Sequence, residues 1–369
     1  MSRMLIQIVP ALPPVINGVG DYALTLARLL RQDFGLDTQF LVGNDNWQGP
    51  DEIDDFRVSK LPSRSARDLE VLLDSLRTTT GSSSVLLHLS IYGYALRGCP
   101  FWLLEGLKRL KSKRPDSRLV TMFHELYAFG PPWSSAFWLS LAQQKICAGV
   151  TQLSDAAVTN ICQFREKIER FDSTKRQRIP VLAIPSGIGE LLVPLDLDSR
   201  CKSMVIFGQA PLRNRTYKTQ MSTLQQACQR LGITEIHDVG PPIDGLPDRV
   251  GNVRITKHGA MNAPELSSLL SNSVAGFLSY YPGCLAKSSV FAAYCAHRLV
   301  PVAPIDNRSD ADGIASGIHY YCVEDSNGAG LGSPNAQSIA DAAWNWYQGH
   351  SLKSHAREFA SALQTDFSS

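Results

Sequence analysis

Short apolar runs alternate with amphipathic stretches along most of this 369-residue chain. The runs have the length and composition of buried strands, and the stretches between them repeat apolar residues at helical spacing. Near-continuous apolar strands separated by helices predict parallel sheets that are covered on both faces. The expected strands are 4–9, 38–42, 84–89, 119–123, 156–159, 180–184, 204–207, 235–239, 253–256, 276–279, 300–303 and 320–323. The expected helices are 22–32, 66–78, 101–111, 135–148, 220–230, 263–271, 288–296, 338–347 and 354–367.

The alternation pauses once, at "SGIGELLVPLDLDSRCKS" (186–203), and then restarts. This segment is rich in Gly, Pro and Asp without a sustained period, which is typical of a linker. The chain is therefore expected to be an α/β protein with two Rossmann-like, doubly wound domains facing a cleft. Ligands bind at the carboxyl ends of parallel strands, so the chemistry is expected at those edges.

Composition narrows the class of protein. A hydrophobic content of 44%, with 19% charged residues, describes a soluble globular chain, and a net charge of +2 argues against broad electrostatic binding of nucleic acid. No apolar run is long enough for a membrane span, and the N-terminal apolar run resembles a first strand more than a signal peptide. The eight cysteines contain no CxxC pair, which favours reduced thiols in the cytoplasm over a disulfide framework or a zinc site.

A glycine-containing segment, "NGVGDYALTLARLL" (17–30), follows the first expected strand. The apolar positions after Asp21 fall on one helix face, so Gly18 and Gly20 are expected in a strand-to-helix loop with Asp21 as the helix cap. Such a loop can bind an anion at the helix N-terminus, or it can be a tight turn without a ligand. The spacing is not GxGxxG, because position 23 is alanine, and no acidic residue ends the second strand at Val42. A dinucleotide site is therefore weakly supported.

This segment and three others resemble, in order, the motifs of retaining GT-B glycosyltransferases of the family 4 type. The resemblance covers nearly the whole chain. It implies an acceptor-side domain at 1–190, a donor domain at 191–345 and a C-terminal helix at 346–369 that crosses back to the first domain. It also implies metal-independent transfer of a sugar from a nucleoside diphosphate donor, such as a UDP- or GDP-sugar, to an acceptor hydroxyl. No further cofactor is expected.

Two of the four motifs belong to the first domain. In the family the glycine segment contacts donor phosphate or acceptor, which maps to Gly18, Val19 and Gly20. "VTMFHELYA" (120–128) resembles the family's apolar strand that ends in histidine. His124 would then orient the donor sugar through a hydroxyl, and Glu125 would bind acceptor hydroxyls. The alternative is a histidine that only caps a strand end.

His88 also ends an expected strand. The stretch Tyr92–Tyr94 that follows it has the look of an exposed acceptor-side loop, although aromatic loop residues often only pack.

The third motif, "MVIFGQAPLRNRTYK" (204–218), resembles the start of the family's donor domain. An arginine and a lysine after its glycine normally neutralise the diphosphate. Here Gln209 stands at the arginine position, one residue after Gly208. The displaced cations Arg213, Arg215 and Lys218 could supply the same charge, or could form a solvated basic loop.

The fourth motif, "VAGFLSYYPGCLAKSSVFAAYCAHRLVPVAP" (274–304), resembles the family segment that carries an E-x7-E carboxylate pair. The pair is missing, because Pro282 and Val290 stand at its two positions. Gly283 is retained. "AKSS" (286–289) offers an ammonium group and two hydroxyls at a helix N-terminus, so the expected phosphate ligands are Lys287, Ser288 and Ser289. The alternative is a capped helix with a surface lysine.

Two weaker similarities complete the comparison. "ITKHGAMNAPELSSLLSNS" (255–273) resembles the family segment under the nucleobase, and "AIPSGIGE" (183–190) resembles its entry to the linker.

The expected partners are a nucleotide-sugar and a small-molecule or glycan acceptor, with no nucleic acid and no transmembrane segment; the oligomeric state is left open. No metal site is expected, since "DAD" (310–312) lies in a polar loop. The sequence leaves three alternatives to the transferase function. One is a non-catalytic GT-B scaffold that binds a sugar nucleotide or a partner. Another is a different GT-B enzyme, such as a sugar-nucleotide epimerase or a cyclitol transferase. The third, a nicotinamide-dependent oxidoreductase, is disfavoured by the incomplete glycine pattern.

Overall fold

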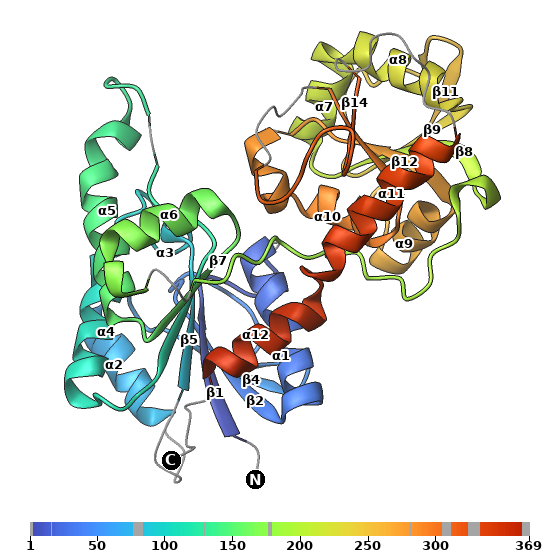
Figure 1. The fold of residues 1–369 in the computed structure, drawn as a ribbon. Helices are drawn as coiled ribbons and strands as arrows, with labels where there is room; N and C mark the ends of the chain where they lie inside the picture. The colour runs from blue at the N-terminus through green and yellow to red at the C-terminus, as the bar shows by residue number, and fades with distance from the viewer. Residues whose placement is uncertain are drawn as a thin grey trace. The chain divides into compact units, whose positions relative to one another are not determined.

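The computed structural model describes residues 3–15, 17–76, 84–128, 130–175, 179–280, 282–304, 311–323 and 333–363. The chain divides into two compact units (Figure 1). The first contains residues 1–182 and 352–369, and the second contains residues 183–351. These divisions fall near residues 190 and 345, where the sequence places its domain boundaries.

The first unit contains a seven-stranded sheet in the order β3-β4-β2-β1-β5-β6-β7. All neighbouring strands pair in parallel except β3, which is antiparallel to β4. The strands are β1 (Arg3–Val9), β2 (Leu36–Val42), β3 (Glu52–Ile53), β4 (Phe56–Lys60), β5 (Ser84–Leu89), β6 (Leu119–Phe123) and β7 (Ala156–Thr159).

Helices cover both faces of this sheet. Alternate strand residues point to opposite faces, and apolar residues of both sets are buried against helices. On one face, Ile6, Val85 and Leu87 pack in a core with α2 (Ala66–Ser75), α4 (Phe101–Lys113), α5 (Ser135–Leu153) and α6 (Cys162–Phe171). On the other face, Leu5 and Leu86 pack with α1 (Gly18–Phe34) and α12 (Leu352–Leu363). A short helix, α3 (Ile91–Tyr94), and a 3₁₀ turn, Ser173–Lys175, complete the unit.

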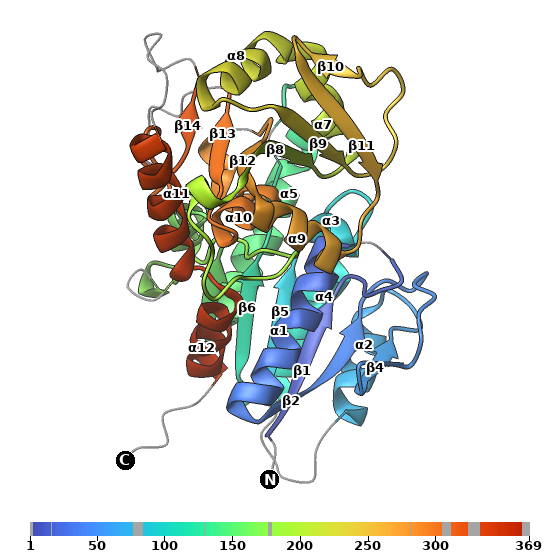
Figure 2. The same cartoon turned by 90° about the vertical axis from the view of Figure 1, so that its right-hand side faces the viewer.

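The second unit repeats the architecture, with the sheet order β10-β11-β9-β8-β12-β13-β14 (Figure 2). Its strands are β8 (Cys201–Phe207), β9 (Glu235–Val239), β10 (Arg249–Val250), β11 (Val253–Gly259), β12 (Ser273–Phe277), β13 (Val300–Ala303) and β14 (Tyr321–Cys322), and only β10 is antiparallel to its neighbour. Its helices are α7 (Ala210–Thr219), α8 (Met221–Leu231), α9 (Ala263–Asn272), α10 (Ser289–Ala296) and α11 (Ser333–Gln348), with 3₁₀ turns at Leu197–Ser199 and Pro282–Lys287.

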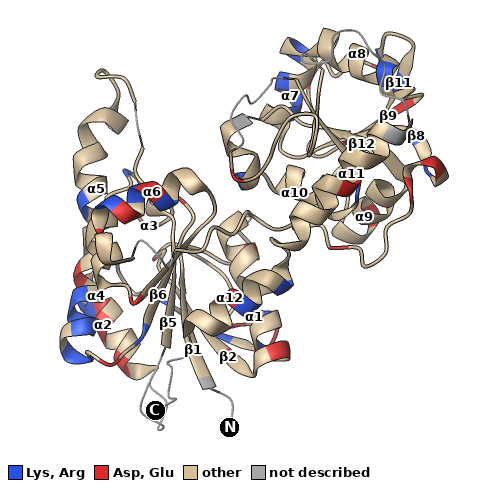
Figure 3. Cartoon of the chain, viewed as in Figure 1, with Lys and Arg blue, Asp and Glu red and all other residues tan. Residues whose placement is uncertain are grey.

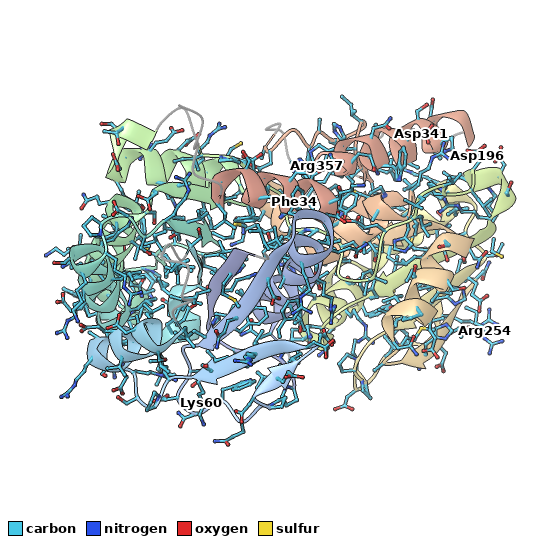
Figure 4. All side chains as sticks on the ribbon, turned by 90° about the horizontal axis from the view of Figure 1, so that it is seen from below. Phe34, Lys60, Asp196, Arg254, Asp341 and Arg357 are labelled. Atoms are coloured by element: carbon cyan, nitrogen blue, oxygen red, sulfur yellow. The ribbon has the colours of Figure 1, made fainter. Side chains whose placement is uncertain are left out.

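The expected linker is tied to the second unit. The backbone N–H of Ser186 donates to the Tyr347 hydroxyl at 2.8 Å. Farther along, Arg298 binds Asp196 at 2.9 Å and Asp341 at 2.6 Å, and both carboxylates are labelled in Figure 4. The segment therefore packs as part of this unit although it has little regular secondary structure.

The expected fold class is confirmed as two Rossmann-like units with parallel-dominated sheets. The expectation that they face a cleft remains a prediction. Several local features differ from the expectations. Gly18 and Gly20 lie in the first turn of α1, the basic segment 210–219 is helical, α6 was not expected, and 180–184 contributes only an isolated bridge from Val181 to Thr159. Residues 77–78, 310 and 364–367 of the expected elements lie outside the described residues.

Across the described parts of the chain, no helix combines the length and the apolar character that crossing a membrane requires.

Candidate functional site

His124 lies at the carboxyl edge of the first sheet, directly after β6, as the sequence predicts. Its side chain is buried, with 7% of the residue exposed. Its backbone N–H donates to the Leu89 carbonyl at 3.0 Å, and its carbonyl accepts from Asn160 Nδ2 at 3.1 Å. Because Leu89 ends β5 and Asn160 follows β7, both neighbouring strands fix the position of this histidine.

A network of buried, hydrogen-bonded polar side chains connects His124 to the interior of the sheet. His124 Nε2 and His88 Nδ1 are 3.1 Å apart, and His88 Nε2 and Gln7 Oε1 are 2.9 Å apart. Gln7 in turn donates from Nε2 to the Thr38 hydroxyl at 3.1 Å. Burial lowers the pKa of His88 to about 3, so this imidazole is neutral at ordinary pH.

Because His88 is neutral, its hydrogen bonds determine which ring nitrogens of His88 and His124 carry protons. With the Gln7 carboxamide oxygen facing His88, the His88 proton is on Nε2, and Nδ1 is left as an acceptor. His124 must then donate from Nε2. The buried residues therefore favour one tautomer of His124, in which the proton is held on the nitrogen that faces the sheet.

Tyr22 and His355 connect His124 to two helices. The Tyr22 ring packs edge-on against His88 and His124, with centroid distances of 5.8 and 5.3 Å. The Tyr22 hydroxyl lies 2.8 Å from His355 Nδ1, which links α1 to α12. Burial raises the pKa of Tyr22 well above its usual value, so the phenol stays protonated and can donate to His355.

Glu125 is exposed at the same edge. Its Oε2 accepts a hydrogen bond from the Ser90 hydroxyl at 2.8 Å, which holds the carboxylate in place. Asn160 is fully buried, and its Oδ1 finds no hydrogen-bond partner among the described residues. Such an orphaned buried acceptor is suited to a ligand or a bound water. Ser90 and Asn160 are not predicted from the sequence, although each directly follows the end of a strand, where ligand-binding residues are expected.

The structure changes the interpretation of the glycine segment. Asn17, and not Asp21 as expected, is the N-cap of α1, and its side-chain oxygen accepts from the N–H groups of Val19 and Gly20 at 2.9 and 3.3 Å. The Asn17 side chain therefore competes with any anion for the N–H groups of Val19 and Gly20. A Cβ atom at Gly20 would overlap the Ala11 carbonyl, whereas one at Gly18 would meet nothing within 4 Å. Close backbone packing therefore explains Gly20 without a ligand.

The expected acceptor-side loop at Tyr92–Tyr94 is instead the short helix α3. Tyr92 is exposed, but Tyr94 is fully buried, and its hydroxyl donates toward the carbonyls of Ile8 and His88 at 3.1 and 3.0 Å. The expectation of exposure is therefore wrong for Tyr94.

In the second unit, Gly208 follows β8 with φ of 125°, a backbone conformation that favours glycine. Arg213 lies on α7 and is buried, where its guanidinium pairs with Asp238 and donates to the Pro241 carbonyl at 2.8 Å. Tyr217 also donates to Asp238, at 2.9 Å. These contacts brace α7 against the end of β9, so Arg213 has a clear structural role.

The other expected phosphate ligands differ in exposure, and Ser288 among them is buried. Arg215 and Lys218 are on the exposed side of α7. Ser288 is the N-cap of α10 and accepts from the Phe291 N–H at 3.2 Å, Ser289 is exposed, and Lys287 is partly buried. Their proximity to a donor phosphate, like that of Gly283, remains a prediction.

Two pockets lie at the carboxyl edge of the second sheet. One has a volume of about 340 Å³ and is lined by Arg213, Asp238, Gly240, Pro242, Ile243, Asp244, Gly245, Leu246, Lys257 and Gly259. Its volume is in the range of small-molecule sites. The other holds about 20 Å³, roughly one water molecule, beside Ser279, Ser288 and Val290. Ser279 Oγ is buried and has no partner within the described ranges.

No cluster of three or more histidine, cysteine, aspartate or glutamate side chains that could hold a metal ion occurs in the part of the chain that the structure describes.

No protein-family model matches the chain, and no curated protein matches its sequence. Solved structures match it over nearly its full length. An alpha-glucosyltransferase in complex with UDP has a TM-score of 0.58 and 12% identity, with 98% of this chain and 100% of that chain covered. The lipopolysaccharide outer core galactosyltransferase WaaB has a TM-score of 0.58 and 11% identity, with 97% and 98% covered. TarM has a TM-score of 0.61 and 9% identity, with 99% of each chain covered. At these identities the likeness establishes the fold alone, which is the GT-B fold of these neighbours.

Proposed function

We propose that the chain is a glycosyltransferase that moves a sugar from a nucleoside diphosphate donor to an acceptor hydroxyl. The observation that carries this proposal is the full-length match in fold to glycosyltransferases, among them one with UDP bound, combined with family-like motifs in the same order along this sequence. Retention of the anomeric configuration and independence from metal are further parts of the proposal. They rest on the resemblance to the family 4 type.

In the first unit, His124 and Glu125 are assigned to the reacting sugars. His124, held toward His88 through its Nε2, is assigned to a hydrogen bond with a hydroxyl of the donor sugar. A hydrogen bond from the imidazole would orient the donor sugar. Glu125, held by Ser90, and the orphaned Oδ1 of Asn160 are suited to sugar hydroxyls at the same edge.

In the second unit, the nucleoside is assigned to the pocket of about 340 Å³ at the ends of β9 and β11. The diphosphate is assigned to Lys287, Ser288 and Ser289, with Gly208 and Gly283 allowing close approach. Negative charge develops on the diphosphate as the glycosidic bond to the donor breaks. An ammonium group and a helix N-terminus stabilise that charge electrostatically.

The test is a donor screen followed by turnover. We expect UDP or GDP to raise the melting temperature of the chain and NAD to leave it unchanged, and we expect acceptor-dependent release of the nucleotide. Lys287→Ala is expected to weaken nucleotide binding by about 1–3 kcal/mol, the usual value of a hydrogen bond to a charged group. Lys353→Ala, at an exposed position on α12, is the matched control. Equal affinity of the Lys287 variant would remove that residue from the site.

A specific observation also favours a second function, that of a non-catalytic scaffold that binds a sugar nucleotide. Val290, which lines the small pocket, stands where the family carries the second carboxylate of its pair. Nucleotide binding without donor hydrolysis or transfer to any acceptor would favour the scaffold over the enzyme.

A further inference from the structure

The first half of α5 carries a group of exposed apolar side chains. The exposed fractions are 86% for Trp133, which directly precedes the helix, 45% for Phe137, 73% for Trp138 and 71% for Leu141. Single exposed apolar residues are ordinary on protein surfaces, but a contiguous group with two indole rings indicates an interaction site.

The opposite side of α5 is already occupied. Ile146, Cys147 and Val150 are fully buried in the core of the first unit. A helix that is apolar on both sides requires a second apolar environment for its outer side. The described part of the first unit does not supply one at these positions, as their exposure shows.

A buried glutamine fastens a second apolar segment beside α5. Gln143 donates from Nε2 to the Tyr92 hydroxyl and to the Arg97 carbonyl, both at 3.0 Å, and its Oε1 accepts from the Ala128 N–H at 2.9 Å. Tyr92 and Leu96 on this segment are 43% and 92% exposed. We refer to the following six residues as the α5 patch: Tyr92, Leu96, Trp133, Phe137, Trp138 and Leu141.

The charge next to the α5 patch is mainly positive. Segments 89–104 and 126–153, which contain the patch, hold Arg97 and Lys145 and no aspartate or glutamate. Lys145 continues the exposed stripe of α5 one turn after Leu141, and the first half of the helix carries no acidic residue in Figure 3. Glu105, the next carboxylate along α4, lies 3.8 Å from Lys108 and 3.7 Å from Arg109. The patch is therefore apolar with two cations beside it, and one exposed carboxylate, Glu125, directly precedes segment 126–153.

The α5 patch lies near the carboxyl edge of the first sheet. β6 ends at Phe123, and the chain reaches the N-terminus of α5 eleven residues after His124, as Figure 1 allows the reader to follow. The helix thus begins at the same edge as the candidate site and runs back along the sheet.

We propose that the α5 patch docks on the surface of a bilayer that contains anionic lipid. Indole and phenol rings are favoured at the boundary between headgroups and acyl chains, because one part of each ring is apolar and another forms hydrogen bonds. Arg97 and Lys145 complement the negative headgroups. A second copy of the chain is a poorer fit, since two identical patches brought together would oppose cation to cation. This proposal does not depend on the proposed transferase function.

The test uses the full chain and sedimentation with vesicles of phosphatidylcholine alone or with phosphatidylglycerol. Binding is expected to the anionic vesicles, and brominated acyl chains are expected to quench tryptophan fluorescence. The double variant Trp133→Ser, Trp138→Ser is expected to lower the partition coefficient at least about tenfold and to remove the quenching. The double variant Arg97→Gln, Lys145→Gln is expected to lower binding to anionic vesicles by about fivefold or more for each lost cation. Val71→Ser, which changes an exposed apolar residue on α2, is the matched control and is expected to change nothing.

Three results of these measurements would contradict the proposal. One is the absence of vesicle binding by the unchanged chain. Another is equal binding by the tryptophan variant. A third is a concentration-dependent dimer that the tryptophan variant abolishes, which would assign the α5 patch to a second copy. Because the substituted side chains are exposed, the urea midpoints of all variants should match the unchanged chain, and this measurement separates lost docking from lost folding.

Discussion

At the scale of single residues, His124 is the side chain on which the proposed chemistry most depends. His124→Ala is expected to lower turnover by about a hundredfold or more while donor affinity changes little, because an orienting group acts mainly on the reacting geometry. Nucleotide binding by calorimetry and initial rates of nucleotide release measure the two effects separately. An unchanged rate would remove His124 from the reacting centre.

His88 makes the stability of the first unit depend on pH. Its pKa is about 3 in the folded chain, against 6.5 for an ordinary histidine, so the unfolded chain binds the proton more tightly. The contribution to stability is therefore complete above pH 6.5 and is lost as the pH falls toward 3. We expect the free energy of unfolding to fall by about 2–3 kcal/mol between pH 6.5 and pH 4.5 from this group.

The check compares urea unfolding of the unchanged chain and of His88→Gln at these two pH values. Glutamine can hydrogen-bond but does not titrate in this range, so the variant should lose most of this dependence. An equal dependence in both proteins would assign the pH effect to other groups, such as His350, whose pKa burial also lowers.

The site residues that the sequence predicts are those that follow a recognisable pattern. His124 and Glu125 directly follow an apolar strand, and their position at the sheet edge follows from that alone. Gln7 and His88 are inside strands, and nothing in a single sequence shows that two strands in different registers bring their side chains together. Pairing between β1 and β5 determines that contact, and pairing is a tertiary property.

At the scale of elements, the two glycines in the first turn of α1 are expected to have different roles, close backbone packing for Gly20 and access for a ligand for Gly18. Gly20→Ala is expected to destabilise the first unit, because a methyl group would overlap the Ala11 carbonyl. Gly18→Ala has open space and is expected to fold normally. If Gly18 serves close approach of a phosphate, its alanine variant will bind nucleotide more weakly at an unchanged melting temperature. Normal folding of Gly20→Ala would contradict the packing explanation.

Helix α7 depends on one buried ion pair. Asp238→Asn removes the charge that faces Arg213 and leaves the guanidinium buried without a counterion, with both side chains only 2% exposed. We expect a loss of about 3–5 kcal/mol in the free energy of unfolding of the second unit, which urea titration measures. Asp248→Asn is the control, since Asp248 pairs with Lys257 at an exposed position and its loss should leave the midpoint unchanged. Equal effects of the two variants would contradict a structural role for the buried pair.

The same helix shows why the sequence misleads at this scale. Segment 210–219 contains proline and several polar residues, so its apolar period is weak. The helix forms because Arg213 and Tyr217, one turn apart, bind the same carboxylate from β9. In contrast, β5, β6 and β7 begin and end where the sequence predicts, because burial on both faces leaves a continuous apolar run with polar residues at both ends.

At the scale of the whole molecule, the chain forms most of the first unit, then the second, and returns to the first at residue 352. The last helix is therefore part of the unit that contains the first residue. α12 lies beside α1, and Figure 4 labels Phe34 of α1 and Arg357 of α12. The order of apolar runs predicts two domains. The apolar pattern of a C-terminal amphipathic helix, however, does not indicate which of the two sheets the helix covers. Only its resemblance to a family pointed to a return.

This path predicts that a substitution near the end of the chain destabilises its beginning. Phe359 is fully buried with Leu26 and Leu30 of α1, so Phe359→Ala should lower the free energy of unfolding of the first unit by about 3–5 kcal/mol. Hydrogen exchange should accelerate in peptides from β1 and β5 and stay unchanged in peptides from β8 and β12. Arg357→Ala, at an exposed position on the same helix, should change neither. Faster exchange in the second sheet alone would mean that α12 stabilises the unit that precedes it in sequence, which its packing against α1 argues against.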